Sequence, residues 1–224
     1  YIVYVRSKNL LKEISIDKEY FLVGTLNDFN GRKLYERNRG IVDNYNFSEA
    51  QLFQSINSLF ESAYPDLKTT EHENGFQIYS ETLAEMIESF YSYQPTGEMV
   101  YTGEDDLSTL DLDSLVDSPE FYASNFDTVY IGTLKNDIFK TDGQKAAFIT
   151  GAYARYGWKV DSQYHIKVYN APTKMSVLSD QLRHLGCADI NQAINRDHIP
   201  TSQTISFTPT EQLKNYLEKY ANKN

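Results

Sequence analysis

One internal repeat constrains the fold of this chain more than any other feature. Residues 21–24 (FLVG) have a counterpart in residues 148–151 (FITG), so that Gly151 follows Gly24 by 127 residues. Nearly the same offset relates a helix expected from residue 48 to one expected from residue 172. A repeat of this kind indicates similar supersecondary units that pack against each other. The expected organisation is a lead-in at 1–18, a first unit at 19–93, an irregular acidic linker at 94–141 and a second unit at 142–224.

Composition agrees with a folded chain of this size. Of the 224 residues, 41% are hydrophobic and 14% aromatic, which is enough to bury a core and excludes disorder as the main state. The single cysteine, Cys187, excludes an internal disulfide framework and a cysteine-rich metal site. No apolar run is long enough for a membrane span and no signal peptide is visible, so we expect an intracellular protein without a membrane partner.

Capping residues and hydrophobic periodicity predict the helices. Ser48 with Gln51, Thr141 with Gln144, and Thr208 with Glu211 have the spacing of capping boxes, and Ser80 precedes a further apolar stripe. The expected helices span 19–30, 48–63, 80–93, 142–157, 172–185 and 209–221. The first of these also has the composition of a buried strand, and its Ala-rich counterpart at 145–157 decides for a helix.

Strand pairs are expected between these helices. The hairpins pair 32–37 with 41–46, 67–72 with 76–79, 158–160 with 164–169, and 187–194 with 204–207. Each unit then reads as helix, hairpin, helix, hairpin, helix. The predicted fold class is α+β, with two pseudo-symmetric αββαββα units that each contain a concave antiparallel sheet.

This order of elements, with the FLVG and FITG segments opening the two units, resembles the two-repeat LAGLIDADG homing endonucleases, including those found inside inteins. The resemblance implies that the two motif helices pack against each other, because in that family small residues allow their backbones to approach closely. It assigns this interface to Gly24, Gly151, Ala147 and Ala154. It also implies concave sheets that face nucleic acid.

The expected catalytic acids of that family are missing. The family places a carboxylate five positions after each motif glycine, and these positions hold Phe29 and Tyr156 here. Neither side chain offers an oxygen suited to Mg²⁺. Asp28 is the candidate substitute, one residue early. We therefore expect no catalytic residue, no metal site and no cofactor, with Mg²⁺ required only if the chain is an active endonuclease.

Basic residues with one interleaved tyrosine mark a possible nucleic-acid surface on the first expected hairpin. The candidate nucleic-acid-binding residues are Arg32, Lys33, Tyr35, Arg37 and Arg39 there, and Lys159 and Lys167 on the second unit. Acidic residues on the same strands balance these charges, which favours weak or local binding because phosphate contacts dominate such affinity. DNA and RNA both remain open as ligands.

The remaining charge is concentrated in one segment. No lysine or arginine occurs between Lys68 and Lys135, whereas acidic residues are frequent there, and the net charge of the chain is −10. This segment reads either as a solvated linker or, with its tyrosines, as a docking surface for a protein partner. The leading hypothesis is a catalytically degenerate LAGLIDADG-type nucleic-acid-binding protein, maturase-like or regulatory. The alternatives are an active endonuclease with rearranged acids, and a fold reused as a protein-interaction module.

Overall fold

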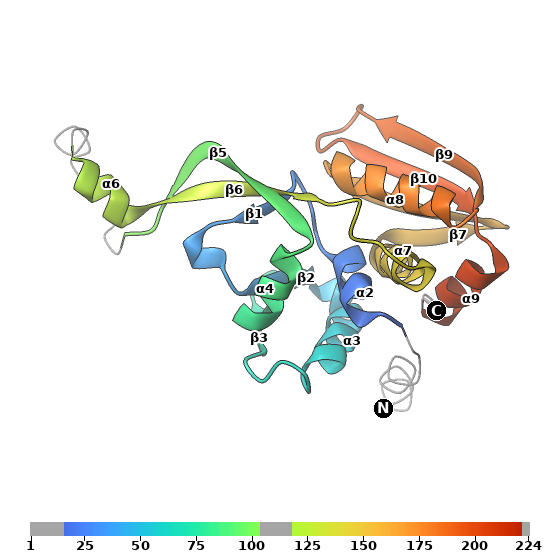
Figure 1. Cartoon of the computed structure of the whole chain (residues 1–224), viewed down its shortest axis with the longest axis horizontal. Helices are drawn as coiled ribbons and strands as arrows, with labels where there is room; N and C mark the ends of the chain where they lie inside the picture. The colour runs from blue at the N-terminus through green and yellow to red at the C-terminus, as the bar shows by residue number, and fades with distance from the viewer. Residues whose placement is uncertain (1–15, 104–117, 221–224) are drawn as a thin grey trace.

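The structure, a computed structural model, describes residues 16–103 and 118–220 and has the expected α+β class (Figure 1). Most of the expected lead-in, residues 104–117 of the expected linker and residue 221 of the last helix lie outside the described residues. The helices are α2 (Lys18–Thr25), α3 (Ala50–Phe60), α4 (Glu81–Glu88), α6 (Pro119–Asn125), α7 (Asp142–Tyr156), α8 (Pro172–His184) and α9 (Glu211–Tyr220), with 3-10 turns η1 (Glu36–Asn38) and η2 (Phe47–Glu49). Among the described residues, no helix is both long and apolar enough to cross a bilayer.

The strands form three antiparallel sheets. The first sheet has the order β2-β4-β3, the second β7-β8-β10-β9 and the arm sheet β1-β6-β5. Their bounds are β1 (Arg32–Leu34), β2 (Ile41–Asn46), β3 (Lys68–His72), β4 (Gly75–Tyr79), β5 (Tyr91–Tyr101), β6 (Phe126–Leu134), β7 (Gly157–Val160), β8 (Gln163–Tyr169), β9 (Ala188–Asn195) and β10 (Ser202–Thr208).

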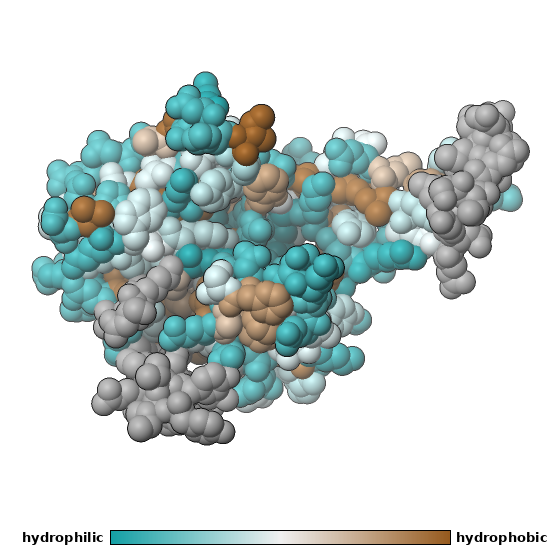
Figure 2. All heavy atoms as spheres, turned by 180° about the vertical axis from the view of Figure 1, so that it is seen from behind, coloured by the Kyte–Doolittle hydropathy of each residue, from teal (hydrophilic) through white to brown (hydrophobic). Residues whose placement is uncertain are grey.

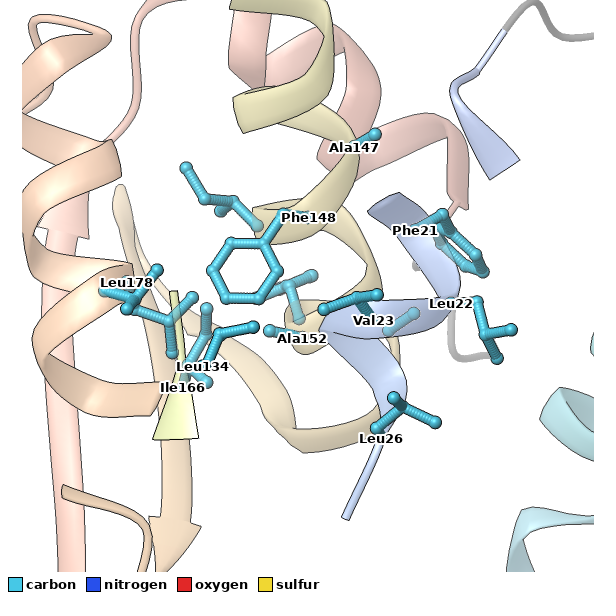
Figure 3. Close-up of a cluster of buried hydrophobic side chains, with 14 of the residues drawn as sticks. Phe21, Leu22, Val23, Leu26, Leu134, Ala147, Phe148, Ala152, Ile166 and Leu178 are labelled. Atoms are coloured by element: carbon cyan, nitrogen blue, oxygen red, sulfur yellow. The ribbon is translucent and has the colours of Figure 1, made fainter. Parts of the chain in front are cut away.

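Helices α2 and α7 lie side by side at the centre of the molecule (Figure 1). A Cβ atom on Gly24 would lie 2.1 Å from the carbonyl oxygen of Phe148, and one on Gly151 would lie 2.0 Å from that of Phe21. Only glycine allows the two backbones to approach this closely. Both helices are largely buried, and Figure 3 shows Phe148 directed from α7 toward Leu178 of α8. The expected helical state of residues 20–25 and the contact between the two glycines are confirmed.

The second unit has the complete expected arrangement. Strands β7 and β8 form one hairpin, β9 and β10 form another, and β8 pairs with β10 to join them into one sheet. Alternate residues of β8 and β10 are buried, among them Ile166 and Ile205, and these face the side that α8 covers. The opposite face of this sheet carries the partly exposed residues, and we call it the outer face of the second sheet.

The first unit differs, because its expected first hairpin does not form. Strand β1 pairs with β6, with Lys33 opposite Ile131, whereas β2 pairs with β4. The carbonyl oxygens of Ile41 and Val42 accept hydrogen bonds from the guanidinium of Arg32 at 3.2 and 3.0 Å. A side chain, rather than the backbone of β1, therefore links this segment to β2. The prediction that 32–37 pairs with 41–46 was wrong, whereas the pairing of β3 with β4 is confirmed.

The expected irregular linker contains regular structure. Strands β5 and β6 pair along most of their length to form a ribbon, and α6 lies near its far end. Figure 1 shows this arm projecting from the body. Aromatic and β-branched residues such as Tyr91, Tyr93, Val129 and Ile131 give these segments a strand preference that their neighbouring acidic residues masked in the sequence. The prediction of an irregular segment was wrong for residues 94–101 and 119–134, and the domain boundaries stay a prediction.

Two helix starts also differ from expectation. The box before α3 joins Asn46 and Glu49 through η2, and the Glu49 carboxylate accepts from the Asn46 N–H at 2.8 Å. Asn46 ends β2 with an extended backbone, so the helical turn begins before Ser48. At α9 the N–H of Leu213 donates to the Thr210 hydroxyl, because Thr208 still belongs to β10. The caps expected at Ser80 and Thr141 are confirmed.

Candidate nucleic-acid interface

A cavity of about 480 Å³ lies at the C-terminal ends of α2 and α7. Its lining comes from the ends of both helices, from the end of β2 and from the second sheet. The lining residues are Leu26, Asn27, Asp28, Phe29, Asn46, Glu49, Arg155, Tyr156, Val168, Tyr169, Ala171, Lys174 and Pro200. The family resemblance predicts paired carboxylates at this position. Whether the carboxylates here are free or ion-paired therefore determines whether the cavity can bind a metal ion.

Asp28 lies after the end of α2, in non-helical backbone. From the sequence it was expected within a helix spanning 19–30, and that expectation was wrong for this residue. It is 6% exposed, and its carboxylate lies 3.2 Å from the ammonium of Lys174. The hydroxyl of Tyr91 donates to both of its oxygens, at 2.9 and 3.1 Å. Lys174 also donates to the carbonyl of Leu26. Asp28 therefore already has two donors inside the protein.

Burial determines the ionisation of these donors. It lowers the pKa of the Lys174 ammonium, which is 1% exposed, and the Asp28 carboxylate only partly offsets this. Burial, with the negative charge of Asp28, raises the pKa of the Tyr91 hydroxyl well above 10. Tyr91 thus remains a neutral donor to Asp28 across the ordinary pH range.

Arg155, at the end of α7, makes a second buried network. Its guanidinium lies 2.7 Å from a carboxylate oxygen of Asp43 and 2.7 Å from one of Glu49. It also donates to the carbonyls of Thr25 and Asn44, at 2.8 Å each. Burial opposes the charge of Arg155, yet the carboxylates outweigh that penalty and raise its pKa. All these partners belong to the first unit, so Arg155 joins the two units.

The two positions at which the family has its acids are not available for metal binding. Phe29 is 41% exposed and lies beyond the end of α2. Tyr156 ends α7, and its hydroxyl is 3.2 Å from the carbonyl oxygens of both Thr25 and Leu26, to which it can donate. Over residues 16–103 and 118–220, no three histidine, cysteine or acidic side chains converge as a metal site would require. With Asp28 and Glu49 already ion-paired, the residues present do not fit Mg²⁺.

The outer face of the second sheet is polar and nearly uncharged. Side chains alternate along the strands, so the residues opposite each other in the register share a face. Lys167 lies opposite Thr204, and Thr204 lies opposite Ala193. The outer-face side chains are Trp158, Val160, Gln163, His165, Lys167, Tyr169, Asn191, Ala193, Asn195, Thr204 and Ser206. Amides, hydroxyls and imidazole are groups that hydrogen-bond to base edges.

The first sheet presents a similar outer face. Phe53 of α3 stacks on Phe76 at 4.6 Å, which shows that α3 covers the other side of this sheet. On the uncovered side, Gln77 donates to Asn44 at 2.9 Å and lies opposite Thr70. Asn46 at the end of β2 and Tyr169 at the end of β8 both line the cavity, so the cavity connects the two outer faces.

The basic residues that were predicted from the sequence to bind nucleic acid do not form one cluster in the structure. Arg32 is held by backbone carbonyls and by the ring of Tyr91, while Arg37 donates to Thr102 and Gly103 on the arm. Three exposed cations pair with single acids: Lys33 with Glu98 at 3.9 Å, Arg39 with Glu36 at 3.4 Å, and Lys159 with Glu218 at 3.3 Å. Only Lys167, of these cations, lies on an outer face as defined above. The backbone N–H of Tyr35 donates to Asn38.

The sequence did not reveal the two buried cations, Lys174 and Arg155, at the C-terminal ends of α2 and α7. Lys174 lies in the first turn of an amphipathic helix, where a lysine is ordinarily exposed, and nothing local indicates that it turns inward. Arg155 had a usable signal, because it is the repeat partner of Asp28 at the same offset that relates the two glycines. Ala147 and Ala154 of α7 are both buried, and their role in the contact between the two helices stays a prediction.

Several solved structures are similar to this chain. A mesophilic variant from the homing endonuclease I-DmoI covers 92% of this chain and 96% of its own, with 13% identity and a TM-score of 0.47. I-DmoI in complex with DNA and Ca has 12% identity and a TM-score of 0.46, over 91% and 88% of the two chains. Full-length DUF199/WhiA from Thermatoga maritima has 9% identity and a TM-score of 0.45, over 96% of this chain and 60% of that one.

At these identities the likeness concerns the fold alone. No protein-family model matches the sequence, and no curated protein matches it.

Proposed function

We propose that this chain is a LAGLIDADG-like protein that binds nucleic acid across the outer faces of its two sheets and does not cut it. The observation that carries the proposal is the state of the cavity between those faces. Lys174 and Arg155 pair with its carboxylates, so the acids of the lining are not free to hold a metal against a phosphate backbone. The two similar units, the close contact between Gly24 and Gly151 and the polar outer faces of the two sheets support a LAGLIDADG-like fold.

DNA is the favoured ligand because β-strands can enter the major groove of a duplex, where amides and hydroxyls hydrogen-bond to base edges. Affinity should be modest, since the outer faces have few cations and phosphate contacts dominate binding. A duplex should bind with a weak dependence on salt. RNA is an outcome that the same titration tests.

Lys167 and Lys159 provide a matched pair for this test. Both are lysines of the second sheet, but Lys167 lies on the outer face, whereas Lys159 pairs with Glu218 of α9 on the other side. Each phosphate contact adds about 0.9 to the slope of log affinity against log salt for duplex DNA. Fluorescence anisotropy titrations with labelled duplex should show that slope reduced by about 0.9 in Lys167→Ala and unchanged in Lys159→Ala. Equal losses in both variants, or no binding at low salt, would contradict the proposal.

The absence of cleavage is tested separately. Incubation with a randomised plasmid library in Mg²⁺ or Mn²⁺ should give no specific double-strand breaks, because metal-dependent hydrolysis needs carboxylates that are free to bind the metal. Specific breaks that disappear in Asp28→Asn would instead show that Asp28 leaves Lys174 and serves as a ligand. That result would favour the active endonuclease.

A second candidate, protein contact, is favoured by the arm. In the described part of its ribbon and helix the charged residues are Glu98, Glu120 and Asp127, which repel a phosphate backbone. Met99 and Tyr130 are exposed there, and Figure 2 shows hydrophobic surface along the arm between the body and the tip. An arm of this composition suits a protein partner better than nucleic acid.

A further inference from the structure

A second cavity, of about 420 Å³, lies at the end of the second sheet away from the helix feet. It is lined by Trp158, Val160, Asp161, Ser162, Gln163, His165, Asp189 and Thr208, and it lies over part of the outer face. None of these residues takes part in the buried networks of Arg155 and Lys174. The cavity therefore has its own chemistry.

The indole of Trp158, supported by His165, supplies a flat aromatic surface in this cavity. The indole of Trp158 lies parallel to the imidazole of His165, with 5.1 Å between the ring centroids and 13° between the ring planes. Trp158 is 41% exposed although it is the single tryptophan of a chain with a well-filled core. An exposed stacked pair of this kind is the form of platform on which unpaired bases stack in nucleic-acid-binding proteins.

Asp189 supplies an acceptor beside the rings. The register of β9 and β10 shifts between Ser206 and Thr208, and this bulge places Asp189 outside the regular alternation of the strand. The hydroxyl of Thr208 donates to Oδ2 of Asp189 at 2.9 Å and holds the carboxylate at the wall of the cavity. Bulges commonly re-aim a side chain in this way.

The charge of the cavity selects the part of a nucleotide that enters it. Asp161 and Asp189 are both in its lining, and the lining contains no lysine or arginine. Carboxylates repel a phosphate but accept hydrogen bonds from N–H groups. Among the bases, guanine offers two adjacent donors, N1–H and the N2 amino group, on its Watson–Crick edge. That edge is accessible only when the base is unpaired.

From these features we propose that the cavity binds one unpaired guanine base, stacked on the exposed indole of Trp158, which His165 supports, and hydrogen-bonded to Asp189. This inference rests on the proposed nucleic-acid function and refines it, because it names the ligand class as a duplex with an extrahelical guanine. A cationic side chain of a protein partner is the other guest that an indole and two carboxylates accept, and the experiment includes it.

Trp158 makes the test direct, since its emission is the only tryptophan signal of the chain. The full chain is titrated with a short labelled duplex that carries one bulged guanine, and with the same duplex fully paired. Anisotropy of the label reports binding as such, whereas quenching of Trp158 reports stacking in the cavity. The bulged-guanine duplex should quench strongly and the paired duplex should not. Bulged adenine, cytosine and thymine should quench less than guanine.

Two variants separate stacking from hydrogen bonding. Trp158→Ala should lower the affinity for the bulged-guanine duplex by roughly 5- to 150-fold, the range for one stacked base, and should abolish the preference for the bulged over the paired duplex. Trp158→Phe keeps a ring and should retain most of the affinity, which guards against a loss caused by misfolding. Asp189→Asn should reduce the preference for guanine over the other bulged bases.

The outcomes distinguish this inference from the function on which it depends. Anisotropy that shows equal binding of paired and bulged duplexes, without quenching, overturns the guanine cavity and leaves nucleic-acid binding in place. An absence of any anisotropy change overturns both. Quenching by an arginine amide or tetramethylammonium, but not by the bulged guanine, overturns the base assignment in favour of a cationic guest.

Discussion

The ends of α2 and α7 occupy equivalent places in the two units, yet they carry opposite charges. Asp28 and Arg155 are 127 positions apart, as Gly24 and Gly151 are. Both are largely buried and ion-paired, Asp28 with Lys174 and Arg155 with carboxylates. In this centre the first unit supplies the acids and the second unit supplies the cations. The centre thus holds complementary charges that pair directly, where the family resemblance expects two like charges that need a metal.

The sheets diverge in a related way. Strand β7 pairs within its own unit, whereas β1, at the equivalent position in the order of elements, pairs with β6 of the arm. The first sheet therefore lacks the strand that would correspond to β7, and the side chain of Arg32 bridges the gap to β2. The strands of the arm, which lie between the two units in the sequence, thus take β1 as an edge strand, whereas β7 remains in the second sheet.

The largest expected effect comes from the contact that the two units share. Gly24→Ala or Gly151→Ala would place a methyl group about 2 Å from a backbone carbonyl oxygen of the other helix, and backbone cannot move aside as a side chain can. We expect a loss of more than about 5 kcal/mol in the free energy of unfolding, enough to prevent folding in a domain of ordinary stability. Urea unfolding followed by far-UV circular dichroism measures it.

Gly143 in the first turn of α7 is the matched control. It is exposed, and the nearest atom to an added Cβ there is 3.8 Å away. Gly143→Ala should be neutral or stabilise the chain by up to about 1 kcal/mol, because alanine is the better helix former. A loss of less than about 1 kcal/mol in Gly24→Ala would mean that the two units do not meet as tightly as the structure has them.

The second effect tests the charge asymmetry. Arg155→Met should lower the free energy of unfolding by about 3 to 5 kcal/mol, because it leaves the buried Asp43 and the partly buried Glu49 without their cation. Arg183→Met removes an exposed arginine that pairs with Asp180 at 3.3 Å and should cost less than about 1 kcal/mol. Equal costs for the two variants, measured by urea unfolding at neutral pH, would show that the Arg155 network adds no more than a surface ion pair.

Local signals explain why much of the fold could be predicted from the sequence. The caps at Ser80 and Thr141 and the hairpin that pairs 67–72 with 76–79 depend on neighbouring residues alone, and they were predicted correctly. The partner of β1 depends on a strand about 100 residues further along the chain, and no local pattern specifies such pairing. The start of α3 was predicted two residues late, because Ser48 and Gln51 have the same capping-box spacing as Asn46 and Glu49, which form the box in the structure.

The site was harder to predict than the fold. Gly24 and Gly151 lie at the contact between the two helices, as the repeat predicted, because close approach of two backbones requires glycine and glycine is visible in the sequence. The buried cations leave none, since a lysine such as Lys174 turns inward only when a tertiary partner such as Asp28 is present. The nucleic-acid roles of the basic residues stay predictions that the lysine pair above tests.

The smallest effect concerns pH and compares a tyrosine of each unit. The folded-state pKa of Tyr91 is raised well above 10 by burial and by Asp28, whereas the unfolded chain titrates near 10. Above pH 10 the unfolded state therefore binds fewer protons than the folded state, and stability falls as pH rises, by up to about 1.4 kcal/mol per pH unit for one such group. Lys174 acts in the opposite sense, because its lowered pKa makes stability rise with pH up to its ordinary value near 10.5.

In Tyr91→Phe the free energy of unfolding should fall less steeply above pH 10, by about 1.4 kcal/mol per pH unit, which corresponds to one proton. In Tyr164→Phe of the second unit the change should be smaller, since Lys159 opposes the rise that burial causes in the pKa of Tyr164. Urea unfolding of the three proteins at several pH values from 9 upward measures the slopes; a Tyr91→Phe slope equal to that of the wild type would show that this hydroxyl ionises freely and does not hold Asp28.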